Sequence, residues 1–254
     1  MDSIQAIIIG IIEGFTEFLP ISSTGHMIVA GKFLGIPQSA VINAYEIIIQ
    51  FAAILAVMLI YRDKLSPKKI DLWSKLMLAF LPFALVGFLV KDYVDVLFNT
   101  QTVAYMFIIG GFVFLVLEYF YKETPSQVRE AEGASWMQAL WIGIAQIFAI
   151  IPGTSRSGAT IVGGLLVGLD RKASSDFSFL LAIPVMGAVS LYSLLKHYHD
   201  FAGANITAFA LGFAVAFVVA YVTVKLFLVF IQRFSFVPFG IYRILFGILL
   251  LMIL

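Results

Sequence analysis

Two glutamates in an apolar stretch are the first residues whose types and spacing indicate chemistry. Glu13 and Glu17 are four positions apart, so a helix places them on one face. Two carboxylates in an apolar helix are costly unless they are paired or bind a cation, and their mutual repulsion adds to that cost. Hard carboxylate oxygens suit Mg²⁺ or Ca²⁺, so the pair predicts a divalent-cation site. The alternative is an aqueous vestibule or a basic partner.

A proline and three hydroxyl residues follow in the segment EGFTEFLPISSTGH. Pro20 ends the first helix, and Ser22, Ser23 and Thr24 provide an N-cap and free amides for the next one. Such a helix N-terminus binds anions, because its first N–H groups are unpaired and its dipole is positive there. His26 lies one turn further along, where it either transfers protons or serves as a structural hydrogen-bonding group.

A second break, PGTSRSGAT, repeats this pattern with a cation in place of the carboxylates. A guanidinium at membrane depth needs an anion, and the fork of Arg156 fits phosphate oxygens in a bidentate manner. The alternative partner of Arg156 is Glu13 or Glu17. The two breaks together predict the following substrate-binding groups: Ser22, Thr24, Gly153, Thr154, Ser155, Arg156 and Ser157.

The two breaks differ at the positions of their chemically active side chains. When the sequence is aligned with itself at a shift of 133 residues, Glu13 falls on Gln146 and Ser23 falls on Arg156. The first break therefore supplies acid, base and hydroxyl groups, and the second supplies the cation. We interpret this as one composite pocket for a diphosphate and a metal ion, inside the bilayer, where the rest of the substrate can be apolar.

The composition indicates which elements position these residues. Of 254 residues, 61% are hydrophobic and 12% are charged, which leaves too little polar surface for a water-exposed globule. The sequence therefore predicts a polytopic, all-α membrane protein. No cysteine is present, so disulfides and thiolate chemistry are excluded, and no basic stripe indicates nucleic acid.

A membrane span requires about 20 mostly apolar residues. Two interrupted apolar regions, 3–36 and 135–169, are typical of re-entrant helix–loop–helix pairs, because irregular backbone at membrane depth is tolerated only along a protein cavity. Six uninterrupted regions have the composition of spans: 44–61, 72–91, 102–121, 175–195, 205–231 and 237–254.

The sequence thus divides into two repeats, residues 1–125 and 134–254, each with a re-entrant pair followed by three spans. An odd number of spans places the start and the end of a repeat on opposite sides of the membrane. The second repeat is therefore expected to be inverted relative to the first. Gly10 falls on Gly143 at the 133-residue shift. The two repeats are expected to form one integrated membrane domain.

The placement of basic residues predicts the orientation. On this topology ten lysines and arginines lie on one side of the membrane and three on the other. Both termini are then expected outside the cell. The ten are Arg62, Lys64, Lys68, Lys69, Lys75, Lys122, Arg129, Arg171, Lys172 and Arg233; the three are Lys32, Lys91 and Lys196.

The two motifs resemble the signatures of the bacterial undecaprenyl-diphosphate phosphatase (BacA/UppP) family, and the resemblance covers essentially the whole chain. It implies hydrolysis of the terminal phosphate of undecaprenyl diphosphate, a polyprenyl lipid, in the bacterial plasma membrane. It also implies recycling of the cell-wall lipid carrier and bacitracin resistance. Glu13 and Glu17 would then serve metal binding and catalysis, and Arg156 would hold phosphate. Ser23 and His26 would be the nucleophile and base candidates.

Three alternatives stay open from the sequence. Either Ser23 or a water molecule attacks phosphorus. Inverted repeats with broken helices are also a transporter design, so a polyprenyl-phosphate flippase is the second functional hypothesis. The sequence allows a homo-oligomer as well as a monomer.

Overall fold

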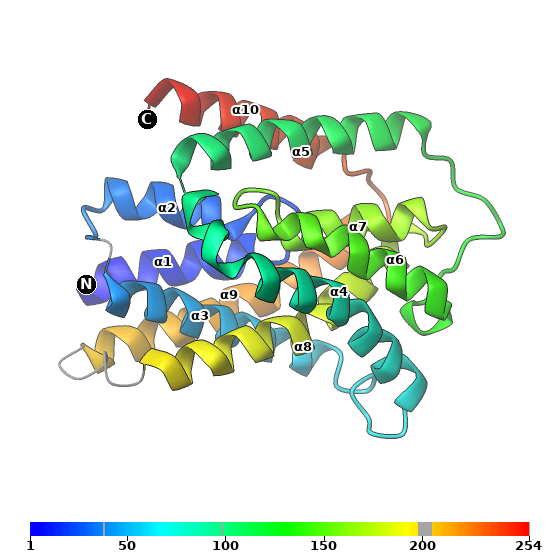
Figure 1. Ribbon diagram of the computed structural model, residues 1–254, viewed down its shortest axis with the longest axis horizontal. Coiled ribbons are helices and arrows are strands. Elements are labelled where there is room, and N and C mark those ends of the chain that lie inside the picture. Colours follow the sequence, from blue (N-terminus) through cyan, green and yellow to red (C-terminus); the bar gives the residue numbers. More distant parts are fainter. Residues whose placement is uncertain (38, 98, 198–204, 254) are drawn as a thin grey trace.

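The computed structural model describes residues 1–37, 39–97, 99–197 and 205–253, and within these ranges every element is helical (Figure 1). The all-α prediction is confirmed for this part of the chain. In chain order the elements are α1 (Ser3–Thr16), α2 (Ser23–Phe33), α3 (Ala40–Ile60), α4 (Ile70–Val94), η1 (Asp95–Leu97), α5 (Thr100–Phe120), η2 (Ala131–Gly133), α6 (Trp136–Gln146), η3 (Ile147–Ile150), α7 (Arg156–Leu166), α8 (Arg171–His197), α9 (Ile206–Ile231) and α10 (Val237–Ile253).

Each interrupted region consists of two short helices joined by irregular backbone. A capping box of Asp2 and Gln5 starts α1, and Ser135 and Gln138 form the same box at the start of α6. The first helix of each pair stops well short of a membrane span. The turn that follows carries the polar motif in both cases.

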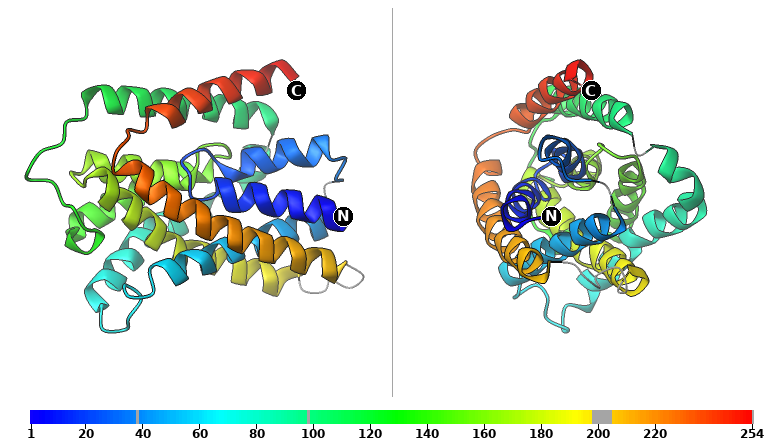
Figure 2. Two further views of the ribbon diagram at one scale, coloured as in Figure 1. Left: turned by 180° about the vertical axis from the view of Figure 1, so that it is seen from behind. Right: turned by 90° about the vertical axis from the view of Figure 1, so that its left-hand side faces the viewer.

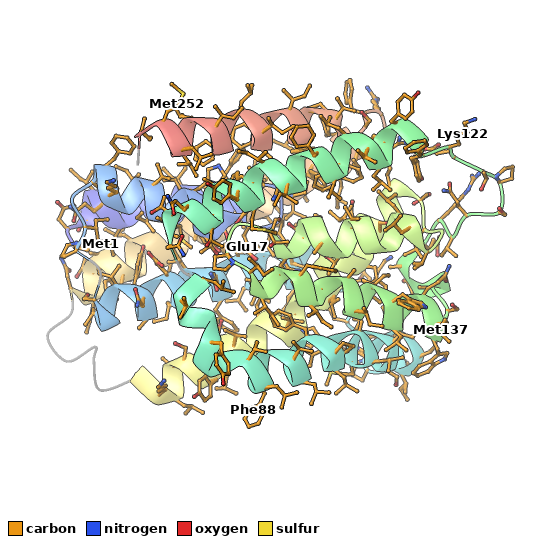
Figure 3. All side chains as sticks on the ribbon, turned by 45° about the horizontal axis from the view of Figure 1, so that its top comes forward. Met1, Glu17, Phe88, Lys122, Met137 and Met252 are labelled. Atoms are coloured by element: carbon orange, nitrogen blue, oxygen red, sulfur yellow. The ribbon has the colours of Figure 1, made fainter. Side chains whose placement is uncertain are left out.

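The two helix pairs open toward opposite ends of the molecule. The outer ends of α1 and α2 lie near both chain termini, whereas those of α6 and α7 lie at the other end (Figures 1 and 2). Figure 3 places Met1 and Met252 at one end, Lys122 and Met137 at the other, and Glu17 between them. The turns of the two pairs therefore meet in the middle.

Five helices of the described part are long and apolar enough to span a membrane: Val41–Ile60, Ile70–Val90, Thr100–Phe120, Arg171–Lys196 and Ile206–Ile231. The predicted sixth span, 237–254, corresponds to α10, which has 17 described residues and belongs with the shorter apolar helices. The count of six spans is therefore not confirmed. At a rise of about 1.5 Å per residue, α10 is still long enough to lie along much of α5, against which it packs.

Large apolar side chains cover the outside of the helix bundle as well as its interior. Phe88 is 70% exposed (Figure 3), and Leu195, Leu226 and Leu245 are also exposed. Such a surface would be unfavourable in water, whereas acyl chains solvate it at no cost. The apolar exterior supports a multi-pass membrane protein.

Candidate active site

The two turns touch directly through a serine of the second motif. The hydroxyl of Ser157, in the first turn of α7, donates to the carbonyl oxygen of Leu19 at 2.9 Å and lies 3.4 Å from that of Glu17. Ser157 is fully buried, so this contact is shielded from solvent. The structure thus places Ser157, predicted to bind substrate, in a contact that joins the two turns and not among the residues that line the cavity between them.

Glu17 lies between the hydroxyl of the first turn and the cation of the second. Its Oε2 accepts a hydrogen bond from the Ser23 hydroxyl at 2.5 Å. Its Oε1 lies 3.4 Å from Nη2 of Arg156, and Nη1 of Arg156 donates to the backbone carbonyl of Ser178 on α8 at 3.1 Å. One carboxylate therefore orients the candidate nucleophile and the candidate phosphate ligand together.

The N-cap residues of α2 and α7 share a strained backbone conformation. Ser22 has φ 67° and Ser155 has φ 74°, in the region that non-glycine residues rarely adopt. Such strain is retained where the surrounding structure fixes it, and it is concentrated at functional sites. The hydroxyl of Ser155 caps α7 by accepting from the N–H of Gly158, whereas the Ser22 hydroxyl makes no capping bond. At both positions the turn presents a helix N-terminus to the same space.

A cavity of about 170 Å³ lies between the two turns. Seven of the predicted site residues line it: Glu17, Ser22, Ser23, Thr24, Gly153, Ser155 and Arg156. The remaining wall is largely apolar and is formed by Phe83, Ala149, Ile150, Ile151, Pro152, Val185, Met186 and Val189, with Gln50 as its polar member. The cavity thus has one side lined by hydroxyl groups, helix N-termini and a guanidinium, and another side that is apolar.

Thr154 does not belong to this cavity. It lines a separate apolar cavity between α5 and α7, and its hydroxyl is buried without a hydrogen-bond partner. The neighbouring Gly153 adopts φ +91°, a backbone conformation that glycine tolerates without strain. Its predicted contact with substrate is not supported by this geometry.

Glu13 is a buried carboxylate close to the turn. It is fully buried, and within the described part of the chain neither of its side-chain oxygens has a hydrogen-bond partner. Its electrostatic neighbours are Glu17, Glu46 and Arg156. A buried, unpaired carboxylate beside a second one fits a divalent ion that keeps water or phosphate oxygens as its other ligands. Among the described residues, no group of three His, Asp or Glu side chains is arranged to hold a metal by itself.

His26 faces away from the cavity. Its Nδ1 lies 2.7 Å from the Ser22 carbonyl and therefore donates to it, which leaves Nε2 to accept from the Tyr242 hydroxyl at 2.6 Å. Its ring stacks on Phe246, and the side chain lines a separate apolar groove with Tyr242. Both ring nitrogens are thus engaged, and neither bonds to Ser23.

Two further polar groups belong to this region. Gln50 lines the cavity from α3, and the guanidinium of Arg243 contacts both turns from α10. Each is a polar residue within an apolar helix, and this pattern marks it in the sequence as a candidate functional residue. Because both residues are far from the motifs in the sequence, their position beside the turns could not be predicted from it.

Comparison with known proteins places these features in context. The family model described as "Bacitracin resistance protein BacA" matches residues 6–249. An undecaprenyl-diphosphatase of Sulfurovum sp. is 71% identical over 254 residues, which are 100% of both chains. An undecaprenyl-diphosphatase of Sulfurimonas denitrificans is 58% identical over 99% of each chain, and the undecaprenyl-diphosphatase 2 of Pseudoalteromonas translucida is 54% identical over 100% of this chain and 99% of its own.

Proposed function

We infer, from the premise that this chain belongs to the bacitracin resistance protein BacA family, that it is an undecaprenyl-diphosphatase. It hydrolyses undecaprenyl diphosphate, with one molecule of water, to undecaprenyl phosphate and inorganic phosphate. The observation that carries this function is Glu17, which contacts both the Ser23 hydroxyl and the Arg156 guanidinium at one cavity between the turns.

The chemistry of the cavity suits phosphoryl transfer, where positioning and electrostatics dominate. Arg156 and the amides of the two helix N-termini bind the terminal phosphate. Ser23 attacks its phosphorus, the bond to the bridging oxygen breaks, and Glu17 accepts the serine proton. Water then hydrolyses the phosphoserine. In the alternative route a water molecule, oriented by the same groups, attacks directly.

The base in this mechanism differs from the one that the resemblance implied. His26 has both ring nitrogens bonded to groups other than the Ser23 hydroxyl, whereas Glu17 already accepts the hydrogen bond of Ser23. Because a base must lie within hydrogen-bond reach of the proton that it removes, the geometry favours Glu17.

Glu13 and Glu17 would hold a divalent cation, Mg²⁺ or Ca²⁺. The unpaired oxygens of Glu13 support this assignment. When bound, the ion would neutralise the charge of the diphosphate and of the leaving phosphate. Without the ion, one of the two carboxyl groups would have to be protonated, because an uncompensated buried carboxylate is costly.

A flippase would use a similar anion site. Transport alone, however, needs no hydroxyl beside a carboxylate, so the contact between Ser23 and Glu17 favours hydrolysis. Release of inorganic phosphate separates the two functions.

We also propose that residues 1–125 and 134–254 are inverted repeats, with re-entrant pairs 3–36 and 135–169. Equivalent features at the 133-residue shift support this. The strained serines Ser22 and Ser155 correspond, and so do the capping boxes. A Cβ on Gly10 would meet the carbonyl oxygen of Gly212, and one on Gly143 would meet that of Ala79, at the same offset.

The cellular setting follows from the reaction. A protein with this activity recycles the lipid carrier of cell-wall synthesis in the bacterial plasma membrane, and its abundance would confer bacitracin resistance. Undecaprenyl diphosphate is the lipid substrate. Whether the chain acts as a homo-oligomer is left to measurement of its mass in detergent.

The first experiment measures phosphate release from undecaprenyl diphosphate by the purified protein in detergent, with Mg²⁺, with Ca²⁺ and with EDTA. The wild type is expected to release phosphate, and EDTA to suppress the release. Arg156→Ala should remain folded and lose at least about 100-fold in kcat/KM. If the protein binds the lipid but releases no phosphate, the proposed phosphatase activity is refuted and lipid transport is favoured.

The same preparation tests the covalent route. Acid quenching during turnover of substrate labelled in the terminal phosphate is expected to trap label on Ser23, and Ser23→Ala should abolish it. Turnover at a wild-type rate by Ser23→Ala, with no label trapped, would establish attack by water.

A further inference from the structure

Arg243 is a fully buried cation that the mechanism above does not use. Its guanidinium donates to backbone carbonyls rather than to a carboxylate. Nη1 donates to Pro20 at 3.1 Å, and Nη2 donates to Gly153 at 2.9 Å and to Met106 at 2.8 Å. Nε lies 3.4 Å from the carbonyl oxygen of Phe107, whose ring also lies beneath the guanidinium.

These carbonyls belong to three separate segments. Pro20 lies in the turn after α1, Gly153 lies in the turn before α7, and the other two carbonyls belong to α5. Within the described ranges no carboxylate is within ion-pair distance of Arg243, so its charge is compensated by carbonyl dipoles alone. Burying a charge in this way is costly, and such residues in membrane proteins are usually kept for function.

The two turns are held at equivalent points. Pro20 precedes Ser23 by three residues, and Gly153 precedes Arg156 by three residues. One side chain therefore holds the carbonyl three residues before the candidate nucleophile and the carbonyl three residues before the candidate phosphate ligand.

The neighbouring helix makes room for this side chain. A Cβ on Gly110 of α5 would lie 2.2 Å from Nη2 of Arg243. Gly110 is also the residue that falls on Arg243 at the 133-residue shift. At this pair of equivalent positions the second half of the chain thus has an arginine, and the first half has a glycine that leaves room for its side chain.

We propose that Arg243 is a positioning residue of the phosphatase, which sets the distance between the two turns so that Ser23 faces the phosphate bound by Arg156. The proposal rests on the function inferred above. Arginine is required because its planar fork donates in several fixed directions at once, whereas a lysine ammonium is a single point of charge.

This role predicts a separation of kcat from KM. Arg156 and the helix N-termini still bind the diphosphate when Arg243 is altered, so KM should change little. Misalignment of the attacking oxygen by about 1 Å costs roughly 100-fold in rate. We therefore expect Arg243→Lys to lose between about 10-fold and 100-fold in kcat, and Arg243→Gln to lose more.

Gly110→Ala provides a test that keeps the arginine. The added methyl group must displace the guanidinium, so kcat should fall while KM and the charge of the site stay unchanged. Gly87→Ala is the matched control, because among the residues that the structure describes no atom lies within 4 Å of a Cβ at Gly87. Phosphate release by wild type and Gly87→Ala establishes the parent function independently of the Arg243 variants.

All variants are assayed for phosphate release from undecaprenyl diphosphate, and their unfolding temperatures are measured in the same detergent. A selective fall of kcat in Gly110→Ala, and in Arg243→Lys where it folds, supports the proposal. It is overturned if folded Gly110→Ala has wild-type kcat, or if kcat falls only in proportion to the fraction of protein that is unfolded. If Arg243→Lys does not fold, Gly110→Ala decides.

Discussion

Glu17 has two partners of opposite kinds, and this explains how one carboxylate serves several steps. Its Oε2 faces a hydroxyl and its Oε1 faces a guanidinium, so the proton acceptor and the orienting ion pair are the same group. Arg156 has only 11% of its side chain exposed, so a phosphate that displaces Glu17 from it would meet little competing water. The roles of Glu17 and His26 can therefore be separated by substitution.

Glu17→Gln should lower kcat by about 100-fold or more, because the amide accepts the hydrogen bond of Ser23 but cannot take its proton, and it also lacks the charge that pairs with Arg156 and would hold the cation. His26→Asn should keep kcat within the same order of magnitude, since its amide can still donate to the Ser22 carbonyl. Steady-state phosphate release measures both. A loss in His26→Asn equal to that in Glu17→Gln would restore His26 as the base.

Close helix contacts hold the motif-bearing helices in place at the level of the elements. Gly10 of α1 lies against Gly212 of α9, and Gly143 of α6 lies against Ala79 of α4. Glycine is required because a Cβ would lie 2.5 Å and 2.3 Å from the facing carbonyl oxygens. Small residues allow such close packing of membrane helices, where apolar burial gives little driving force.

Gly10→Ala and Gly143→Ala should each destabilise the protein by about 1–3 kcal/mol, because backbone rather than a flexible side chain must move. Thermal unfolding in detergent measures the effect, with Gly87→Ala again as the control. Unfolding temperatures equal to that of the control would show that the helices separate at no cost.

An ionic network joins the two halves of the whole molecule at the end opposite to the termini. Lys64 and Lys69 donate to Glu132 at 2.7 and 3.1 Å. Tyr61 of α3 donates to the buried carboxylate of Asp176 on α8 at 2.5 Å. The network thus connects the loop after α3 to η2 and to the first turns of α8, and it closes this end of the bundle.

This network makes stability depend on pH. Burial alone would raise the pKa of Glu132, but the hydrogen bonds from Lys64 and Lys69 outweigh it and lower the pKa from 4.5 to about 2. Because the folded-state pKa is depressed, the stabilisation is fully present above about pH 4.5 and is lost as the pH falls toward 2.

Glu132→Gln should therefore unfold a few degrees below the wild type at pH 7, and this difference should shrink as the pH falls below about 4.5. Unfolding temperatures of both proteins between pH 3 and pH 7 measure it. A difference that does not depend on pH would assign the effect to packing instead of charge.

The orientation in the membrane is testable because the chain has no cysteine. Gln101→Cys lies at the start of α5, near the end with the termini, and Ser126→Cys lies in the loop at the other end. The distribution of basic residues predicts that the second end lies in the cytoplasm. In intact cells an impermeant maleimide should label position 101 and spare position 126, and the reverse pattern would invert the topology.

The sequence by itself determined the helical membrane class and the positions of both breaks. Apolar runs, prolines and hydroxyl clusters are local signals, so they predicted the interruptions that the structure has at residues 17–22 and 147–155. The family resemblance is confirmed for the same reason, since it rests on two contiguous motifs. The sixth span was less certain, because α10 is near the lower limit of spanning length.

Only the tertiary structure decided which of these groups face one another. Ser157, Thr154 and His26 share the motifs with Ser23 and Arg156, yet the direction of each side chain depends on backbone angles at Ser22, Gly153 and Ser155 and on packing against α5 and α10. Arg243 and Gln50 lie far from the motifs in the sequence. Their place beside the turns depends on how the helices assemble, because contacts between distant segments leave no local pattern for the sequence to display.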